Sequence, residues 1–102
     1  MSRLIPPTLL SQIPDLYETE EVSNPICQVK LFTPDSNWTW YIIELSKEDG
    51  NTCYGYVQGL ERELGYFTLE ELESLNGPLG LAIERDLSFQ PTLLSKITSH
   101  NP

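Results

Sequence analysis

WTWYIIELSKEDGNTCYGYVQ, residues 38–58, has the pattern of a β-hairpin. Residues 38–45 are dense in aromatic and β-branched side chains, the types that favour strands. Residues 52–58 alternate small or apolar side chains with tyrosines, which is typical of a second strand. The connection, residues 46–51, contains Asp-Gly, a dipeptide that favours a tight hairpin turn. We therefore predict two antiparallel strands here and expect a sheet to form around them.

Further strands are predicted on both sides of this hairpin. Residues 27–33 alternate between the two faces of an extended chain and predict a strand. The turn that follows, residues 33–37 (TPDSN), combines proline with side chains that bond their own backbone. Residues 79–89 predict a return strand. Residues 59–65 predict a single helical turn that stops at Gly65.

Two short terminal helices are predicted at residues 7–13 and 91–97. Their sequences are nearly the same, PTLLSQI and PTLLSKI, and each begins with a proline, which is favourable at the first helical position. An echo of seven residues is too short to indicate an internal duplication. We expect two similar amphipathic helices lying side by side on the sheet.

The clearest local signal is the start of a helix at residues 69–75. Thr68 and Glu71 form a capping box, in which each side chain accepts a hydrogen bond from the other's backbone N–H. Phe67 and Leu72 occupy the positions of a hydrophobic staple. We expect the leucines of this helix to be buried and its glutamates exposed: Leu69, Leu72, Leu75 inside, and Glu70, Glu71, Glu73 outside.

The predicted fold class is α+β, with a small, mostly antiparallel sheet of about four strands. Short helices are expected at the N-terminus, in the middle and at the C-terminus. The 102 residues fit one domain. We assign residues 1–97 to it and expect residues 98–102, with the only histidine, His100, to be a flexible tail.

Charge narrows the classes of partner. The chain contains fifteen Asp and Glu residues and six Lys and Arg residues, so its net charge is −9. A protein that binds nucleic acid through its phosphates needs the opposite sign, and direct nucleic-acid binding is disfavoured. No apolar run approaches the roughly 20 residues of a membrane span, and the N-terminus does not have the pattern of a signal peptide. We expect a cytoplasmic protein that does not bind membranes.

The sequence contains none of the common patterns of cofactor-binding or catalytic residues. Cys27 and Cys53 have no CxxC partner and no nearby histidine, so zinc binding and thiol catalysis are poorly supported. We expect two buried thiols; a transient disulfide would require the two cysteines to face each other across neighbouring strands. No nucleophile elbow, P-loop or GxGxxG motif is present. No cofactor, metal or catalytic residue is predicted.

An aromatic segment at residues 32–41 is the first candidate binding site. On an extended chain Trp38 and Trp40 share one face, beside a polar turn that contains Asp35 and Asn37. Either the tryptophans form a platform and the turn supplies hydrogen bonds to a ligand or partner, or the tryptophans belong to the core.

Arg85 is the second candidate, because strand alternation places it on the same face as apolar neighbours. A buried arginine needs a carboxylate partner, and Asp35, Glu44 or Glu63 could serve. The pattern fits a structural ion pair or an edge position, or else a site for an anion or a carboxylate.

The third candidate is an acidic surface made of Glu70, Glu71 and Glu73, close in sequence to Glu61 and Glu63. It is either a solvated helix face or a surface for a basic partner. Paired carboxylates also serve in acid–base chemistry and in binding divalent cations, but none of these follows a known metal-binding loop spacing.

The chain resembles an uncharacterised bacterial family across nearly its whole length. The resemblance rests on GLERELGYF (59–67), TLEELE (68–73) and GPLGLAIERDLSF (77–89), with VKLFTPDSNWTWY (29–41) in support. The family consists of small proteins of unknown function carried on plasmids, conjugative elements and phages. Ala82 stands where proline is expected. The resemblance implies a mobile-element context and carries no activity or catalytic residue.

The function expected from these observations is a non-enzymatic, acidic accessory factor of a mobile genetic element that binds another protein. One alternative is a mimic of nucleic acid that blocks a restriction or defence enzyme. Another is a small ligand-binding domain or enzyme that uses an aromatic pocket with Asp35 and Arg85. A concave pocket that joins Asp35, Trp38 and Arg85 would favour the last alternative, and a convex acidic surface would favour a protein partner or mimicry.

Overall fold

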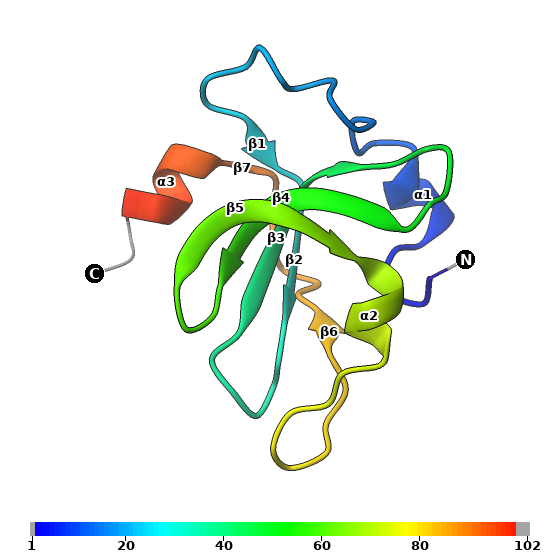
Figure 1. Cartoon of the computed structure of the whole chain (residues 1–102), viewed down its shortest axis with the longest axis vertical. Coiled ribbons are helices and arrows are strands. Elements are labelled where there is room, and N and C mark those ends of the chain that lie inside the picture. The colour runs from blue at the N-terminus through cyan, green and yellow to red at the C-terminus, as the bar shows by residue number, and fades with distance from the viewer. Residues whose placement is uncertain (1, 100–102) are drawn as a thin grey trace.

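A computed structural model describes residues 2–99 and confirms the α+β class (Figure 1). A five-stranded antiparallel sheet has the order β5-β4-β3-β2-β6, and a two-stranded sheet pairs β1 with β7. The large sheet comprises β2 (Val29–Phe32), β3 (Thr39–Leu45), β4 (Thr52–Gln58), β5 (Arg62–Thr68) and β6 (Glu84–Arg85). The remaining elements are β1 (Ile26–Cys27), β7 (Thr92–Leu93), α1 (Pro7–Leu10), α2 (Leu69–Glu73) and α3 (Leu94–Ser99). No helix within residues 2–99 is long and apolar enough to cross a membrane.

The predicted hairpin is confirmed as β3 and β4, and both faces of the sheet are covered. Trp40 and Ile42 belong to a core cluster on one face, called here the tryptophan face. Tyr41 and Tyr56 belong to a second cluster on the other, the tyrosine face. A β-bulge between Ile42 and Glu44 interrupts strict alternation and brings Glu44 opposite Tyr54, on the tyrosine face.

The helical turn predicted at residues 59–65 is wrong, because the chain makes a second hairpin there. β5 pairs with β4 through seven consecutive residue pairs, from Gln58↔Arg62 to Thr52↔Thr68. Gly65, the predicted helix stop, lies in the middle of the strand opposite Gly55. The extra strand gives the large sheet five strands instead of four.

The return strand predicted at residues 79–89 is reduced to the two residues of β6. Before it, the chain forms a tight loop in which the Gly80 amide donates to the Gly77 carbonyl and the Gly77 amide to the Leu81 carbonyl, both at 2.9 Å. After it, the Asp86 amide still donates to the Lys30 carbonyl of β2 at 2.9 Å, and a turn follows in which the Phe89 amide donates to the Asp86 carbonyl at 3.3 Å. Leu79 and Leu87 consequently lie exposed on loops.

The two helices with nearly identical sequences do not lie side by side. Figure 1 shows α1 and α3 at opposite ends of the molecule. Leu9 and Leu10 pack against the tryptophan-face core, whereas Leu94 and Ile97 pack against the tyrosine-face core. The last helix also runs further than predicted and includes Thr98 and Ser99, while residues 100–102 lie outside the described part.

The two cysteines are buried free thiols, as expected, and they lie on opposite faces of the sheet. Cys27 belongs to the tyrosine-face core and Cys53 to the tryptophan-face core, an arrangement that does not suit a disulfide between them. Burial raises the pKa of Cys27 to about 12 and that of Cys53 well above its usual range. Both thiols are protonated at neutral pH and are therefore poor nucleophiles.

Candidate functional site

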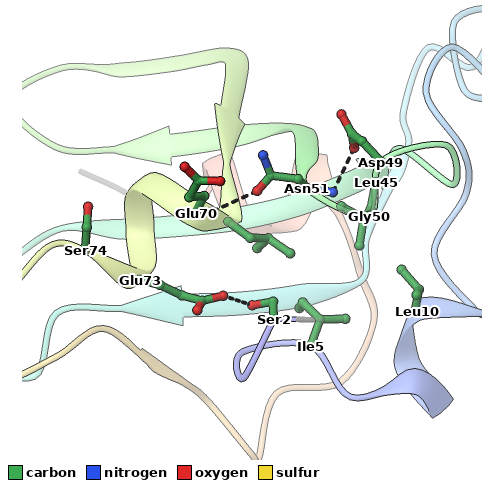
Figure 2. A pocket seen from close by; sticks show the side chains of 11 residues that line it. Ser2, Ile5, Leu10, Leu45, Asp49, Gly50, Asn51, Glu70, Glu73 and Ser74 are labelled. Carbon is green, nitrogen blue, oxygen red and sulfur yellow. Dashed lines mark hydrogen bonds between the residues drawn. The ribbon is translucent and has the colours of Figure 1, made fainter.

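An open cavity of about 790 Å³ lies on the tryptophan side of the sheet, between α2, the β3–β4 turn and the N-terminal segment. Figure 2 shows three carboxylates around it, from Asp49 in the turn and from Glu70 and Glu73 on α2. Its apolar lining includes Ile5, Leu10, Leu45 and Leu69. No lysine, arginine or histidine is among the residues that line it. We call this feature the acidic cavity.

The β3–β4 turn fixes Asp49 at the cavity edge. One carboxylate oxygen of Asp49 accepts hydrogen bonds from the amides of Asn51, at 2.8 Å, and Thr52, at 2.9 Å. The other accepts from the Thr52 hydroxyl at 2.7 Å. Gly50, with φ of 60°, supplies the left-handed conformation that lets the chain turn here.

Asn51 joins this turn to the start of α2. Its side-chain oxygen accepts from the Glu70 amide at 2.8 Å (Figure 2). Its backbone carbonyl accepts from the Leu69 amide at 2.9 Å. Two otherwise unpaired N–H groups at the helix N-terminus are satisfied in this way. The turn that carries Asp49 and the helix that carries Glu70 and Glu73 are therefore joined by hydrogen bonds.

The predicted capping box at α2 is confirmed. The Glu71 amide donates to the Thr68 hydroxyl at 3.1 Å, and the Thr68 amide donates to the Glu71 carboxylate at 2.9 Å. Glu71 therefore stabilises the helix start, whereas Glu70 and Glu73 line the cavity. Glu73 also accepts a hydrogen bond from the Ser2 hydroxyl. The helix ends at Glu73, and Leu75 is exposed rather than buried as predicted, because it lies beyond the last turn.

The two tryptophans have different environments. Trp40 is 5% exposed and lies in the core, whereas Trp38 is 37% exposed. Their rings stack with centroids 5.8 Å apart. The Trp38 ring also covers Gly59, where an added Cβ would lie 2.2 Å from the indole. Trp40 is thus a core residue, and Trp38 leaves one side of a small aromatic stack accessible.

Asp35 holds a neighbouring loop. One of its carboxylate oxygens accepts from the Leu79 amide at 2.7 Å, while the other is buried against Gly77. The absence of a side chain at Gly77 is what makes room for this carboxylate. Asn37 is exposed in the same β2–β3 turn. The local role of Asp35 is to fasten residues 77–81 to the turn.

Arg85 is half-buried, and its guanidinium donates to the Leu4 carbonyl at 2.9 Å. The carboxylates predicted as its partners are placed otherwise: Asp35 bonds the 77–81 loop, Glu44 accepts from the amides of Tyr17 and Thr19, and Glu63 is exposed on β5. A carbonyl partner is sufficient here because the arginine lies at the edge of the core. Arg85 lines a different cavity, of about 260 Å³, which Asp35 and Trp38 do not line.

A model of the family described as protein of unknown function (DUF2958) matches residues 4–99. The chain belongs to this family. DUF2958 membership agrees with the resemblance to an uncharacterised family, and it carries no activity or site residue. No curated protein and no solved structure was found to match the chain.

The sequence did not connect Asp49 and Asn51 with the glutamates of α2 that line the same cavity in this DUF2958 protein. The Asp-Gly-Asn turn and the capping box were both recognised, but their contact depends on β5, which pairs Thr68 with Thr52. Recognising the second hairpin would have brought them together. Among residues 2–99, no group of three or more His, Cys, Asp and Glu side chains is arranged to hold a metal ion.

Acid should weaken the fold through Asp49. The hydrogen bonds from Thr52 and Asn51 lower the pKa of Asp49 from 3.8 to about 2. Between these pH values the unfolded chain binds more protons than the folded one. The stability that Asp49 contributes is therefore present above about pH 4 and is lost as the pH falls through about 2. The pKa values of Asp15 and Asp86 are also lowered, which adds to the same trend. Urea unfolding at several pH values should show a smaller decline for Asp49→Asn than for the wild type; an equal decline would contradict this.

Proposed function

We propose that this chain is a non-enzymatic protein-interaction domain whose acidic cavity receives a lysine or arginine side chain of a partner protein. The observation that carries the proposal is the cavity itself, in which three carboxylates stand over apolar residues and no cation is among the lining side chains. Long basic side chains bury their hydrocarbon stems on apolar surface and keep the charged group in a polar environment. The cavity offers both environments together.

The electrostatics support a basic partner. A net charge of −9 attracts positively charged surfaces and accelerates encounter with them. Asp49 keeps its negative charge at neutral pH because its pKa is about 2. Its hydrogen bonds also fix its position, so a bound cation would meet a carboxylate that is already oriented.

The alternative of a ligand-binding domain or enzyme built on Asp35, Trp38 and Arg85 receives less support. Asp35 is engaged by the 77–81 loop, and Arg85 lines a cavity to which neither Asp35 nor Trp38 contributes. The proposed setting is the cytoplasm of a bacterium that carries a mobile element. The mobile-element context comes from the family resemblance, and the cytoplasmic location from the sequence patterns.

Capture of partners from bacterial lysate tests the proposal with two charge-matched variants. Glu70→Gln with Glu73→Gln removes two charges at the cavity, and Glu21→Gln with Glu84→Gln removes two at exposed positions outside its lining. The cavity variant should retain at least tenfold less of a specific partner, and the surface variant should match the wild type. Thermal unfolding must show that both variants are folded.

Two outcomes would contradict this proposal. Equal retention by the cavity variant would show that the partner binds elsewhere. Equal losses in the two variants would show that net charge, rather than the cavity, governs binding. If the retained protein is a DNA-binding enzyme that duplex DNA displaces, the chain acts instead as a mimic of nucleic acid.

A further inference from the structure

Strand β5 forms an outer edge of the large sheet, as Figure 1 shows. The Leu69 amide donates to the Asn51 carbonyl and the Gly59 amide to the Glu61 carbonyl, so the odd-numbered residues of this hairpin direct their backbone groups between the strands. In an antiparallel ladder the alternate residues point the other way. The N–H and C=O groups of Leu64 and Tyr66 therefore face away from β4.

Natural edge strands are usually protected by being very short or bulged, or by charged residues or proline. β5 is seven residues long, pairs with β4 without a register shift and contains no proline. Its charged residues, Arg62 and Glu63, are confined to its first two positions. Leu64 is 46% exposed and Tyr66 58% exposed. The edge is thus suited to accept another strand.

Nothing within residues 2–99 requires a glycine at position 65, in the middle of this strand. Its φ is not positive, and an added Cβ would meet nothing within 4 Å. Glycine in a strand interior weakens the strand, and it often marks a place where a ligand or another backbone approaches closely. The opposite residue, Gly55, is different, because a Cβ there would collide with the Tyr41 carbonyl. An external segment that fills the space above Gly65 would account for the glycine.

The two faces beside this edge differ in chemistry. Leu64 and Tyr66 lie opposite Tyr56 and Tyr54 on the tyrosine face, where they line a cavity of about 300 Å³. The Tyr54 and Tyr66 rings are 5.1 Å apart. On the tryptophan face, exposed Glu63 lies opposite Val57. An added strand would meet an aromatic surface with one set of side chains and a carboxylate with the alternate set.

We propose that the β5 edge binds an extended segment of another protein in which apolar and basic residues alternate. The backbone of Leu64 and Tyr66 pairs with the segment, its apolar side chains lie against the tyrosine face, and its basic side chains lie beside Gly65 and Glu63. This mode of binding obtains affinity from main-chain hydrogen bonds and specificity from alternate side chains. The proposal goes beyond the acidic cavity, because that cavity lies on the tryptophan side and is lined by other residues.

Amide hydrogen exchange with the heptapeptide KVKVKVK tests this edge directly. The protein should carry Glu70→Gln and Glu73→Gln, so that lysine binding in the acidic cavity does not contribute. At saturating peptide, the amides of Leu64 and Tyr66 should exchange at least tenfold more slowly, with no change at Leu87 on its distant loop. The peptide EVEVEVE should leave all of these amides unchanged.

Three variants separate pairing from side-chain contact. Leu64→Pro removes an outward N–H without removing a bond to β4 and should abolish binding, whereas Leu64→Ala keeps the N–H and should weaken binding only a few-fold. Gly65→Val fills the open space and should weaken binding at least fivefold without lowering the melting temperature, which keeps the test valid if the proline variant fails to fold.

Several results would overturn the proposal. The first is that KVKVKVK leaves amide exchange at Leu64 and Tyr66 unchanged. The second is that EVEVEVE protects these amides as well as KVKVKVK does. The third is that a folded Gly65→Val variant binds KVKVKVK as tightly as the protein with Gly65. Protection that grows with protein concentration in the absence of peptide would identify a second copy of the chain as the occupant and would also contradict it. The variant that lacks Glu70 and Glu73 is used in every measurement, so the test of the β5 edge does not depend on the acidic cavity. A negative result at β5 therefore does not contradict the proposed function, and a negative result for the cavity does not contradict binding at β5.

Discussion

Replacing Glu44 with alanine should lower the free energy of unfolding by about 2–4 kcal/mol. The Glu44 side chain is only 3% exposed, yet it is charged and belongs to the bulged part of β3. Its carboxylate accepts from the Tyr17 amide at 2.9 Å, from the Thr19 amide at 3.0 Å, and from the Thr19 hydroxyl. Alanine leaves these donors without their charged acceptor and leaves a void beneath the loop.

The Glu44→Ala substitution should loosen the loop at residues 15–22 before it affects the rest of the fold. Tyr17 has φ of 72°, a conformation that is unfavourable for a bulky side chain and persists only when the surroundings impose it. Here the hydrogen bond from its amide to Glu44 imposes it. Urea unfolding measures the total loss, and limited proteolysis of the native state measures loosening of the loop. Glu48→Ala, an exposed change in the following turn, should stay within about 0.5 kcal/mol of the wild type. Equal effects of the two variants would contradict this account.

Gly55→Ala should destabilise the protein by about 3 kcal/mol. A Cβ at this position would lie 1.9 Å from the Tyr41 carbonyl oxygen, in the backbone of the neighbouring strand. Neither strand can yield locally, because β4 is paired on both sides. The central hairpin would have to shift as a whole.

Gly65→Ala is the matched control for this change. Gly65 is the register partner of Gly55 on β5, and an added Cβ there would meet nothing within 4 Å. This variant should lie within about 0.5 kcal/mol of the wild type or be slightly more stable, because alanine restricts the unfolded chain more than glycine does. Thermal unfolding should show Gly55→Ala melting at least about 10 °C lower. Similar melting temperatures for the two variants would show that glycine propensity, and not the collision, is responsible.

The features that the sequence predicted well depend on neighbouring residues. The β3–β4 hairpin follows from its strand composition and its Asp-Gly turn, and the start of α2 follows from Thr68 and Glu71, three residues apart. The features that were wrong depend on distant pairing. β5 forms a strand because β4 lies beside it, although the glycine at 65 is unfavourable in a strand. The two PTLLS segments diverge because one packs on each face of the sheet.

In the candidate site too, the features that depend on neighbouring residues were predictable and those that depend on distant contacts were not. The glutamates of α2 were found from helical periodicity, but nothing local links them to Asp49 and Asn51. Strand alternation predicts that Arg85 lies in the core and therefore needs a carboxylate partner. Its strand is only two residues long, and the arginine instead reaches the Leu4 carbonyl from a segment 81 positions earlier. Such a contact has no signature in a single sequence.

The most direct test of the central claim, a basic side chain bound in the acidic cavity, is an NMR titration of the labelled protein with trilysine amide at low ionic strength. The account predicts amide shift changes concentrated at Asn51, Glu70 and Ser74, which border the cavity, and their loss in Glu70→Gln with Glu73→Gln. Shift changes spread evenly over the acidic surface, or equally large in that variant, would contradict it.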